Sequence, residues 1–270
     1  MIQHPIPIKP NHDEGLVEVE CWITQEEARH LYSGAFWNDQ EVEKGKEWWI
    51  EDGSDGGELR AHLERSGSLA EFHTAIRLLK ESAKLKGRVL DAAAGTCWTA
   101  ALLSRFPEVD HIDAVDLSWH RITFLAERTI DELDGIPSKI SRIFGSFLDV
   151  HRPDHIYDIV FLSAAFHHCA EVVWLLAELD RCLAPNGAMV LIGERPVTWT
   201  AQAWRMASTL VRRRQLLFEY RELFPPHPET GDHYYRRSDY VDLFGGFGYR
   251  LHIERIGRKN HVLVASKSKL

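Results

Sequence analysis

Short apolar segments alternate with helix-length segments from residue 87 onward, and this alternation constrains the fold more than any other feature. The β-rich segments are residues 88–91, 112–115, 140–144, 158–162 and 188–192, and the helical segments between them are residues 96–106, 118–133 and 172–183. Residues 159–162 and 189–192 are apolar without interruption, which is typical of strands buried on both faces. Strands and helices that alternate in this way predict a mostly parallel α/β sheet with helices on both sides.

Two further regions flank this alternating core. Residues 1–84 predict a mainly helical extension, which ends in an amphipathic helix with apolar residues at positions 69, 72, 76, 79 and 83. After the fifth strand, residues 197–237 predict a helical insertion, and residues 249–256 and 261–266 predict two closing strands joined by a hairpin turn. We therefore expect one main domain over residues 85–270, with residues 1–84 as a lid and the insertion as a cap over the site.

The composition excludes several classes of protein. The chain has 270 residues, of which 44% are hydrophobic and 27% charged, as in an ordinary globular protein. Its formal net charge of -8 would repel a phosphate backbone, so nucleic acid is not expected as a partner. No apolar run reaches the ~18 residues that span a bilayer, and the N-terminus lacks the apolar core of a secretory signal. The cysteines form no Cys-x-x-Cys pair, which favours a reduced, cytoplasmic protein without membrane contact.

A ligand site is expected where the first two predicted strands end. The first strand ends at Asp91, and small residues then lead to a helix that begins near Thr96. The second strand ends at Asp116, from which one carboxylate can accept hydrogen bonds from both hydroxyls of a ribose. The simpler interpretation is that Asp91 and Asp116 each cap the following helix and that Gly95 only makes a tight turn.

Two other nucleotide-binding motifs are missing from the sequence. Residues 91–97 do not have the Gly-x-Gly-x-x-Gly spacing that places a pyrophosphate on a helix N-terminus. The chain also has no Gly-x-x-x-x-Gly-Lys-Ser/Thr segment, which excludes a P-loop. A nicotinamide-dependent oxidoreductase is therefore disfavoured.

Five features, in the right order, resemble the class I S-adenosylmethionine-dependent methyltransferases. They are residues 89–97 (VLDAAAGTC), Asp116, residues 144–147 (FGSF), residues 157–168 (YDIVFLSAAFHH) and residues 179–188 (LDRCLAPNGA). The resemblance covers residues 87–267 and implies a Rossmann-like, doubly wound sheet of strand order 3-2-1-4-5-7-6 with the last strand antiparallel. It also implies S-adenosyl-L-methionine as cofactor, held by Asp91, Ala93, Gly95, Asp116, Leu117, Ser146, Phe147 and Ser163.

The sequence departs from the family pattern of acid-x-Gly-x-Gly-x-Gly at two positions. Ala93 and Cys97 stand where glycines are common, and only Gly95 remains. Ser146 stands where an acidic residue often accepts a hydrogen bond from the adenine amino group, which a hydroxyl does more weakly. These departures motivate a second hypothesis, a cofactor-binding regulator or partner subunit without transfer activity.

His167 and His168 follow the fourth strand and are the candidate general bases. A neutral imidazole can take the proton of an acceptor hydroxyl near pH 7, and the leaving group of methyl transfer needs no acid. The alternative is that either histidine only packs or bonds to the backbone. Because the first acid after this strand is Glu171, we expect no catalytic metal.

Five residues after the fifth strand are candidates for acceptor binding: Glu194, Arg195, Tyr234, Tyr235 and Arg236. The alternative for residues 234–237 is that they anchor their loop to the core. The resulting hypothesis is methyl transfer to a small-molecule acceptor, with an oxygen of a natural product or sugar-type metabolite as the target. Carbon and nitrogen acceptors, and a homodimer, are left open.

Overall fold

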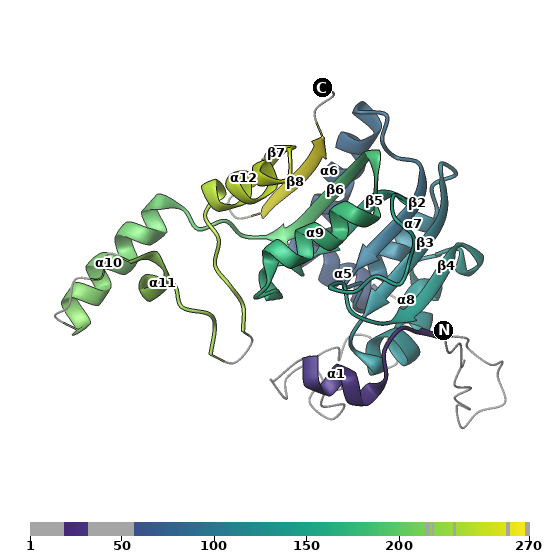
Figure 1. The fold of residues 1–270 in the computed structure, drawn as a ribbon, viewed down its shortest axis with the longest axis horizontal. Coiled ribbons are helices and arrows are strands. Elements are labelled where there is room, and N and C mark those ends of the chain that lie inside the picture. The colour runs from purple at the N-terminus through teal and green to yellow at the C-terminus, as the bar shows by residue number, and fades with distance from the viewer. Residues whose placement is uncertain are drawn as a thin grey trace.

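The computed structural model describes residues 19–31, 57–213, 217, 219–228, 231–257 and 260–267. Within these residues eight strands form one sheet, in the order β1-β4-β3-β2-β5-β6-β8-β7 (Figure 1). The strands are β1 (Glu20–Cys21), β2 (Gly87–Ala92), β3 (Val109–Asp116), β4 (Ile140–Phe144), β5 (Tyr157–Ser163), β6 (Leu183–Glu194), β7 (Tyr249–Ile256) and β8 (Asn260–Lys267). The α-helices are α1 (Gln25–Leu31), α5 (Gly57–Ser66), α6 (Ser68–Glu81), α7 (Trp98–Ser104), α8 (Ala126–Glu132), α9 (Val172–Cys182), α10 (Trp199–Arg213), α11 (Tyr220–Leu223) and α12 (Arg237–Gly246). A π-helical turn, η1 (Arg121–Leu125), precedes α8, and two short 3-10 turns are η2 (Pro137–Lys139) and η3 (Phe166–His168).

Strands β2 to β8 follow the predicted order 3-2-1-4-5-7-6. Strands β4, β3, β2, β5 and β6 pair in parallel, and β8 lies antiparallel between β6 and β7. The predicted Rossmann-like, doubly wound sheet is therefore confirmed. The prediction did not include β1, which pairs in parallel with the edge strand β4, so the N-terminal extension is not wholly helical.

Both faces of the sheet are buried. Along β2, Val89 enters one hydrophobic core with Phe72 of α6, whereas the next residue, Leu90, enters another with Leu179 of α9 and Phe244 of α12. Side chains alternate between the faces of a strand, so an uninterrupted apolar run fills both cores. This is why the strands could be recognised from the sequence.

The residues Pro185-Asn186-Gly187 predict a turn that precedes the fifth strand, and Ser238 predicts the cap of a last helix that ends at Phe244. Both predictions are wrong. Strand β6 begins at Leu183, which pairs with Tyr157, so the predicted turn at residues 185–187 lies within an irregular part of the strand rather than before it. Helix α12 begins after Arg236, whose backbone N–H donates to the Asp239 carboxylate, so Ser238 does not cap it. In the first case pairing with a neighbouring strand overrode local turn chemistry, and in the second an acid one turn into the helix supplied the acceptor.

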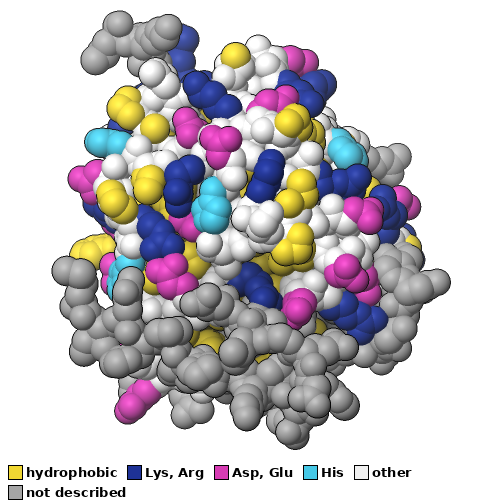
Figure 2. Space-filling view, turned by 90° about the vertical axis from the view of Figure 1, so that its right-hand side faces the viewer, with side chains coloured by type: hydrophobic (Ala, Val, Ile, Leu, Met, Phe, Trp, Pro, Cys, Tyr) yellow, Lys and Arg dark blue, Asp and Glu magenta, His cyan; other side chains and the backbone are white. Residues whose placement is uncertain are grey.

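Helices α10 and α11 project from the side of the sheet, whereas α6 and α9 lie against it (Figure 1). Acidic and basic side chains are interspersed on the face that Figure 2 shows, which lies on the side away from α10. None of the helices in the described ranges combines the length and the apolar character needed to cross a bilayer.

Candidate functional site

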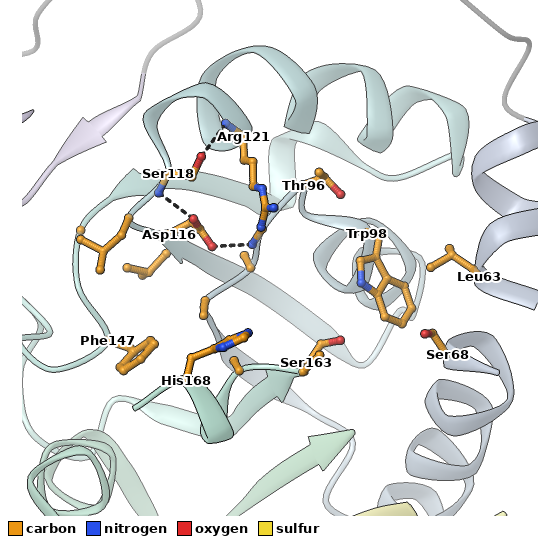
Figure 3. Close-up of a pocket in the computed structure, with 18 of the residues that line it drawn as sticks. Leu63, Ser68, Thr96, Trp98, Asp116, Ser118, Arg121, Phe147, Ser163 and His168 are labelled. Carbon is orange, nitrogen blue, oxygen red and sulfur yellow. Dashed lines mark hydrogen bonds between the residues drawn. The ribbon is translucent and has the colours of Figure 1, made fainter. Parts of the chain in front are cut away.

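A cavity of about 330 Å³ lies at the carboxyl ends of β2, β3 and β5 (Figure 3). Ligands of open α/β sheets bind at this edge, because the loops that follow neighbouring parallel strands meet there. The lining residues come from those loops, from the loop after β4 and from two N-terminal helices: Leu59, His62, Leu63, Ser68, Ala93, Ala94, Gly95, Thr96, Trp98, Val115, Asp116, Leu117, Ser118, Arg121, Gly145, Phe147, Ser163, Ala164, Ala165 and His168.

The loop after β2 follows an unusual backbone path beside the cavity. Ala93, Gly95 and Cys97 have positive φ angles of 59°, 57° and 64°. For Ala93 and Cys97 this left-handed conformation costs roughly 1–2 kcal/mol each, because the Cβ crowds a backbone carbonyl. Hydrogen bonds from Ala94 N–H to Val115 O (2.9 Å) and from Cys97 N–H to Ala94 O (2.8 Å) hold the loop in place. The two residues thus adopt a conformation that ordinarily favours glycine.

Asp116 lines the cavity and is held by two backbone groups. Its Oδ2 accepts a hydrogen bond from Gly95 N–H and its Oδ1 accepts one from Ser118 N–H, both at 2.7 Å (Figure 3). Burial raises the pKa of Asp116 above its ordinary value, although Arg121 and these N–H groups oppose the shift. Each carboxylate oxygen has a second lone pair, so Asp116 can also accept hydrogen bonds from a ligand.

Asp91 is not among the residues that line the cavity. Its side chain is fully buried, and its Oδ2 accepts a hydrogen bond from the Thr99 hydroxyl of α7 at 2.5 Å. Burial raises the pKa of Asp91 to about 7, against the effect of its hydrogen bonds. Its Oδ1 has no hydrogen-bond partner in the part of the chain that the structure describes. Asp91 therefore ties β2 to the helix that follows the loop.

The two candidate bases have different surroundings. His168 lines the cavity, and its Nδ1 lies 2.7 Å from Oδ1 of Asp232. Burial and the adjacent His167 lower the pKa of His168, despite the nearby carboxylate. The Nδ1 of His167 instead lies 3.1 Å from both carboxylate oxygens of the buried Glu194. Burial alone would lower the pKa of His167, but the hydrogen bond to Glu194 outweighs it and raises that pKa.

The other predicted residues divide between the cavity and its surroundings. Those predicted to hold the cofactor that line the cavity are Ala93, Gly95, Asp116, Leu117, Phe147 and Ser163. Ser146 is buried outside the lining, and its Oγ accepts a hydrogen bond from Leu148 N–H at 3.1 Å. None of the predicted acceptor-binding residues lines the cavity: Glu194, Arg195, Tyr234, Tyr235 and Arg236. Glu194 accepts a hydrogen bond from the buried Tyr240 hydroxyl at 2.7 Å.

The strands that form this site match a known protein family. Residues 90–191 match the model of a family described as methyltransferase domain. This range contains Asp116, both candidate histidines and the carboxyl ends of all three strands at the cavity. These residues carry a methyltransferase domain, which supports the predicted class I S-adenosylmethionine-dependent methyltransferase. The match supports the predicted family, enzyme class and cofactor.

Solved structures share the fold of this methyltransferase. A protein from Pyrococcus horikoshii is 17% identical, with 85% of this chain and 99% of that chain covered and a TM-score of 0.55. A proposed methyltransferase from Bacillus halodurans is 16% identical (72% and 99% covered, TM-score 0.53), and the structure of a DhpI–SAH complex is 14% identical (76% and 87% covered, TM-score 0.53). At these identities the likeness concerns the fold alone. A search of curated protein sequences finds no match.

Sequence reasoning did not find one wall of the methyltransferase cavity. Leu59, His62 and Leu63 of α5 and Ser68 at the start of α6 form this wall, and Trp98 of α7 lies next to it (Figure 3). The available signal was the four-residue spacing of Leu59 and Leu63, which places both on one helix face. Arg121 was also missed, although it follows Asp116 by little more than one helical turn.

Proposed function

We propose that this methyltransferase transfers a methyl group to a hydroxyl of a small molecule, such as a natural product or a sugar-type metabolite. The observation that supports it most is that Asp116 and His168 line one cavity. A site for the cofactor ribose and a candidate base for the acceptor are thereby brought to the same space. Cytoplasmic location and a homodimer stay predictions.

Asp116 is the proposed ribose ligand. Gly95 and Ser118 each occupy one lone pair of its carboxylate oxygens and hold the group in a fixed orientation. The remaining lone pair on each oxygen can accept a hydrogen bond from one ribose hydroxyl. A ligand that donates in this way would also offset the desolvation that raises the pKa of Asp116.

His168 is the proposed base. In the tautomer that donates from Nδ1 to Asp232, the Nε2 atom carries the lone pair that can take a proton. As the acceptor oxygen attacks the methyl carbon, the carbon–sulfur bond breaks, its electron pair stays on sulfur, and the hydroxyl proton moves to Nε2. The lowered pKa keeps His168 neutral near pH 7, whereas the Glu194 contact favours the protonated form of His167.

The cavity favours a compact acceptor. Its volume of about 330 Å³ lies at the lower end of the range of small-molecule sites. Leu59, Leu63 and Trp98 supply apolar lining, and His62 and Ser68 supply polar groups. The α5 contribution supports a lid formed by the N-terminal extension. For the predicted cap over residues 197–237, support is limited to its last part, where the backbone N–H of His233 donates to His167 O at 2.7 Å.

The test is an assay of the purified full-length protein with S-adenosylmethionine and a panel of hydroxyl, amine and carbon acceptors. We expect His168→Ala to lower kcat by about 100-fold or more without changing cofactor affinity, and His252→Ala on the exposed face of β7 to leave both unchanged. Activity of the wild type should fall on acidification through a pKa below 6.5, because protonation removes the base. Cofactor binding without turnover on any acceptor would instead favour a partner subunit.

A metal is not expected to take part. His167, His168 and Asp232 offer ligand atoms within 4.8 Å of one another, but two of these groups already contact each other, because His168 Nδ1 lies 2.7 Å from Asp232 Oδ1. Dialysis against a chelator should therefore leave activity unchanged. Loss of activity that a divalent ion restores would contradict this expectation and would assign the three side chains to a metal.

A further inference from the structure

Helix α10 exposes its apolar side and turns its polar side inward. An α-helix rotates by about 100° per residue, which gathers its large and small apolar residues on one arc: Trp199, Ala203, Trp204, Met206, Ala207, Leu210 and Val211. Of these, Trp199 and Val211 are 79% exposed and Trp204 is 68% exposed. On the opposite arc, Arg205 is half-buried with its guanidinium 4.8 Å from the centre of the Phe224 ring.

This arrangement is the reverse of what a helix does when it packs on its own domain. A surface helix normally directs its apolar arc toward the core. Here α10 projects beyond the sheet with α11 beside it (Figure 1), and neither helix contributes to the lining of the cavity. A contiguous exposed apolar surface of this kind marks a site that binds another molecule or a membrane.

The charge of the residues in and around α10 indicates which kind of partner binds there. Residues 195–218 contain no acidic residue and these arginines: Arg195, Arg205, Arg212, Arg213 and Arg214. The whole chain, by contrast, carries a net charge of -8, and the face in Figure 2 mixes both signs. A strongly amphipathic helix with tryptophans on one arc and arginines on the other has the chemistry of a helix that lies in a membrane interface.

We propose that α10 docks this protein on the surface of a bilayer that contains anionic lipids. The helix lies in the plane of the bilayer, with Trp199, Trp204 and Val211 at the boundary between headgroups and acyl chains and with the exposed Arg212 among the headgroups. A second copy of the chain is disfavoured as the occupant, because pairing of two such helices would bring two arginine-rich segments together. Docking on a bilayer departs from the expectation of no membrane contact, which rested on the lack of an apolar run long enough to span a bilayer; surface docking requires no such run.

The first measurement is co-sedimentation of the full-length protein with vesicles. We expect at least about tenfold stronger partitioning to vesicles of phosphatidylglycerol and phosphatidylcholine in equal parts than to phosphatidylcholine alone. The difference should disappear near 0.5 M salt, where the Debye length falls to about 4 Å. Equal partitioning to both vesicles, or none to either, would overturn the proposal.

Two pairs of variants locate the contact. Trp204→Ser should weaken partitioning to the anionic vesicles by about tenfold, whereas Trp174→Ser, at a 69% exposed tryptophan on α9, should not change it. Arg212→Glu should weaken it by about tenfold or more, whereas Arg250→Glu on the exposed side of β7 should have a much smaller effect. The charge variant does not depend on the apolar arc, so it tests the proposal even if Trp204→Ser fails to fold.

A separate measurement tests whether a second copy of the chain, rather than a bilayer, binds the apolar arc. Sedimentation velocity without lipid should give a species whose mass does not respond to Trp204→Ser. A dimer that this substitution dissociates, together with unchanged vesicle binding, would assign the apolar arc to a second copy and overturn docking on a bilayer. Cofactor binding measured in parallel should be the same for all four variants, because none of the four substituted residues lines the cavity.

Discussion

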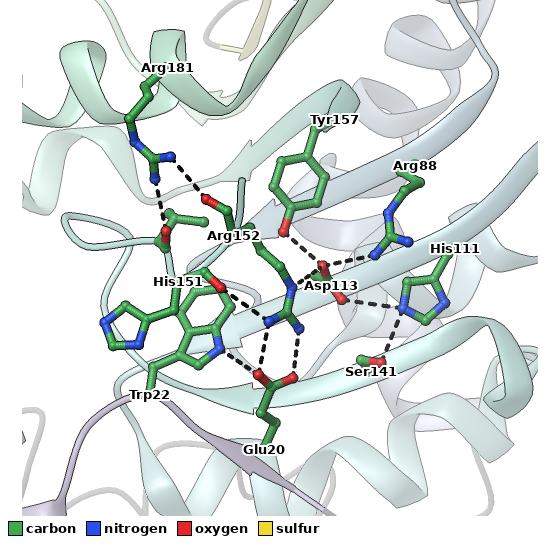
Figure 4. Close-up of polar contacts among 11 residues, drawn as sticks. Glu20, Trp22, Arg88, His111, Asp113, Ser141, His151, Arg152, Tyr157 and Arg181 are labelled. Atoms are coloured by element: carbon green, nitrogen blue, oxygen red, sulfur yellow. Dashed lines mark hydrogen bonds and ion pairs between the residues drawn. The ribbon is translucent and has the colours of Figure 1, made fainter. Parts of the chain in front are cut away.

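Asp113 and Asp116 lie three residues apart on β3, yet their surroundings differ in kind. Asp113 is 1% exposed and accepts hydrogen bonds from the Tyr157 hydroxyl (2.7 Å) and the Arg152 Nε (3.1 Å), as Figure 4 shows. Burial would raise its pKa, but these two partners outweigh burial and lower it. At Asp116 only backbone N–H groups donate among the bonds described above, and burial prevails. A carboxylate satisfied by side chains stabilises the fold, whereas one with remaining capacity can bind a ligand.

The Asp113 network extends to the N-terminal strand. Arg152 contacts both carboxylate oxygens of Glu20 on β1, at 2.8 and 2.6 Å, and its guanidinium lies 5.1 Å from the centre of the Trp22 ring (Figure 4). Through Arg152, the buried Asp113 therefore connects β3 to β1, although the strand beside β1 in the sheet is β4. The network fixes one edge of the sheet, and the cavity lies at the carboxyl ends of the strands.

The largest expected effect is that of Asp113→Asn on stability. We expect the free energy of unfolding, measured with urea, to fall by about 3–5 kcal/mol, because Arg152 loses a buried counter-charge. Asp110→Asn is the matched control, since Asp110 is exposed on the same strand and should change stability by less than about 0.5 kcal/mol. If both variants were equally stable, Asp113 would not be the structural member of the pair.

Asp116→Asn should affect binding instead. We expect calorimetry to give an affinity for S-adenosylmethionine about 100-fold lower, because two charge-assisted hydrogen bonds to the ribose are weakened. Stability should change by less than about 1 kcal/mol, since the amide oxygen can replace one acceptor of the carboxylate. Asp110→Asn again serves as the control. Undiminished cofactor affinity in Asp116→Asn would contradict the assignment of the ribose site.

The two neighbouring aspartates show which features could be predicted from the sequence and which could not. The strands and Asp116 were predictable, because buried runs and the residue that ends them are local features. The role of Asp113 was not, since its partners Arg152 and Tyr157 are about 40 residues away along the chain. The same holds for His167, whose orientation depends on Glu194 of another strand. The roles of these residues depend on side-chain partners that tertiary structure brings together, and local sequence patterns do not reveal such partners.

The dependence of stability on acidic pH should also distinguish Asp113 from Asp116. The folded pKa of Asp113 lies below its ordinary value of 3.8, so its stabilisation is present above that pH and is lost as pH falls through the folded pKa. The folded pKa of Asp116 lies above 3.8, so its ionisation reduces stability as pH rises. Between pH 5 and pH 3, Asp113→Asn should therefore lose less stability than wild type, and Asp116→Asn should lose more than wild type. Changes of the opposite sign would show that the surroundings are misassigned.

The smallest expected effect is at the exposed end of the network. Arg152 lowers the pKa of Glu20, although partial burial opposes this, and the Glu20 side chain is 45% exposed. Solvent screening therefore limits the loss in Glu20→Gln to about 1 kcal/mol or less in urea unfolding, and salt should reduce it further. Glu108→Gln, at an exposed residue before β3, is the control. A loss as large as that of Asp113→Asn would mean that attachment of β1, rather than the buried charge itself, accounts for the stability assigned to Asp113.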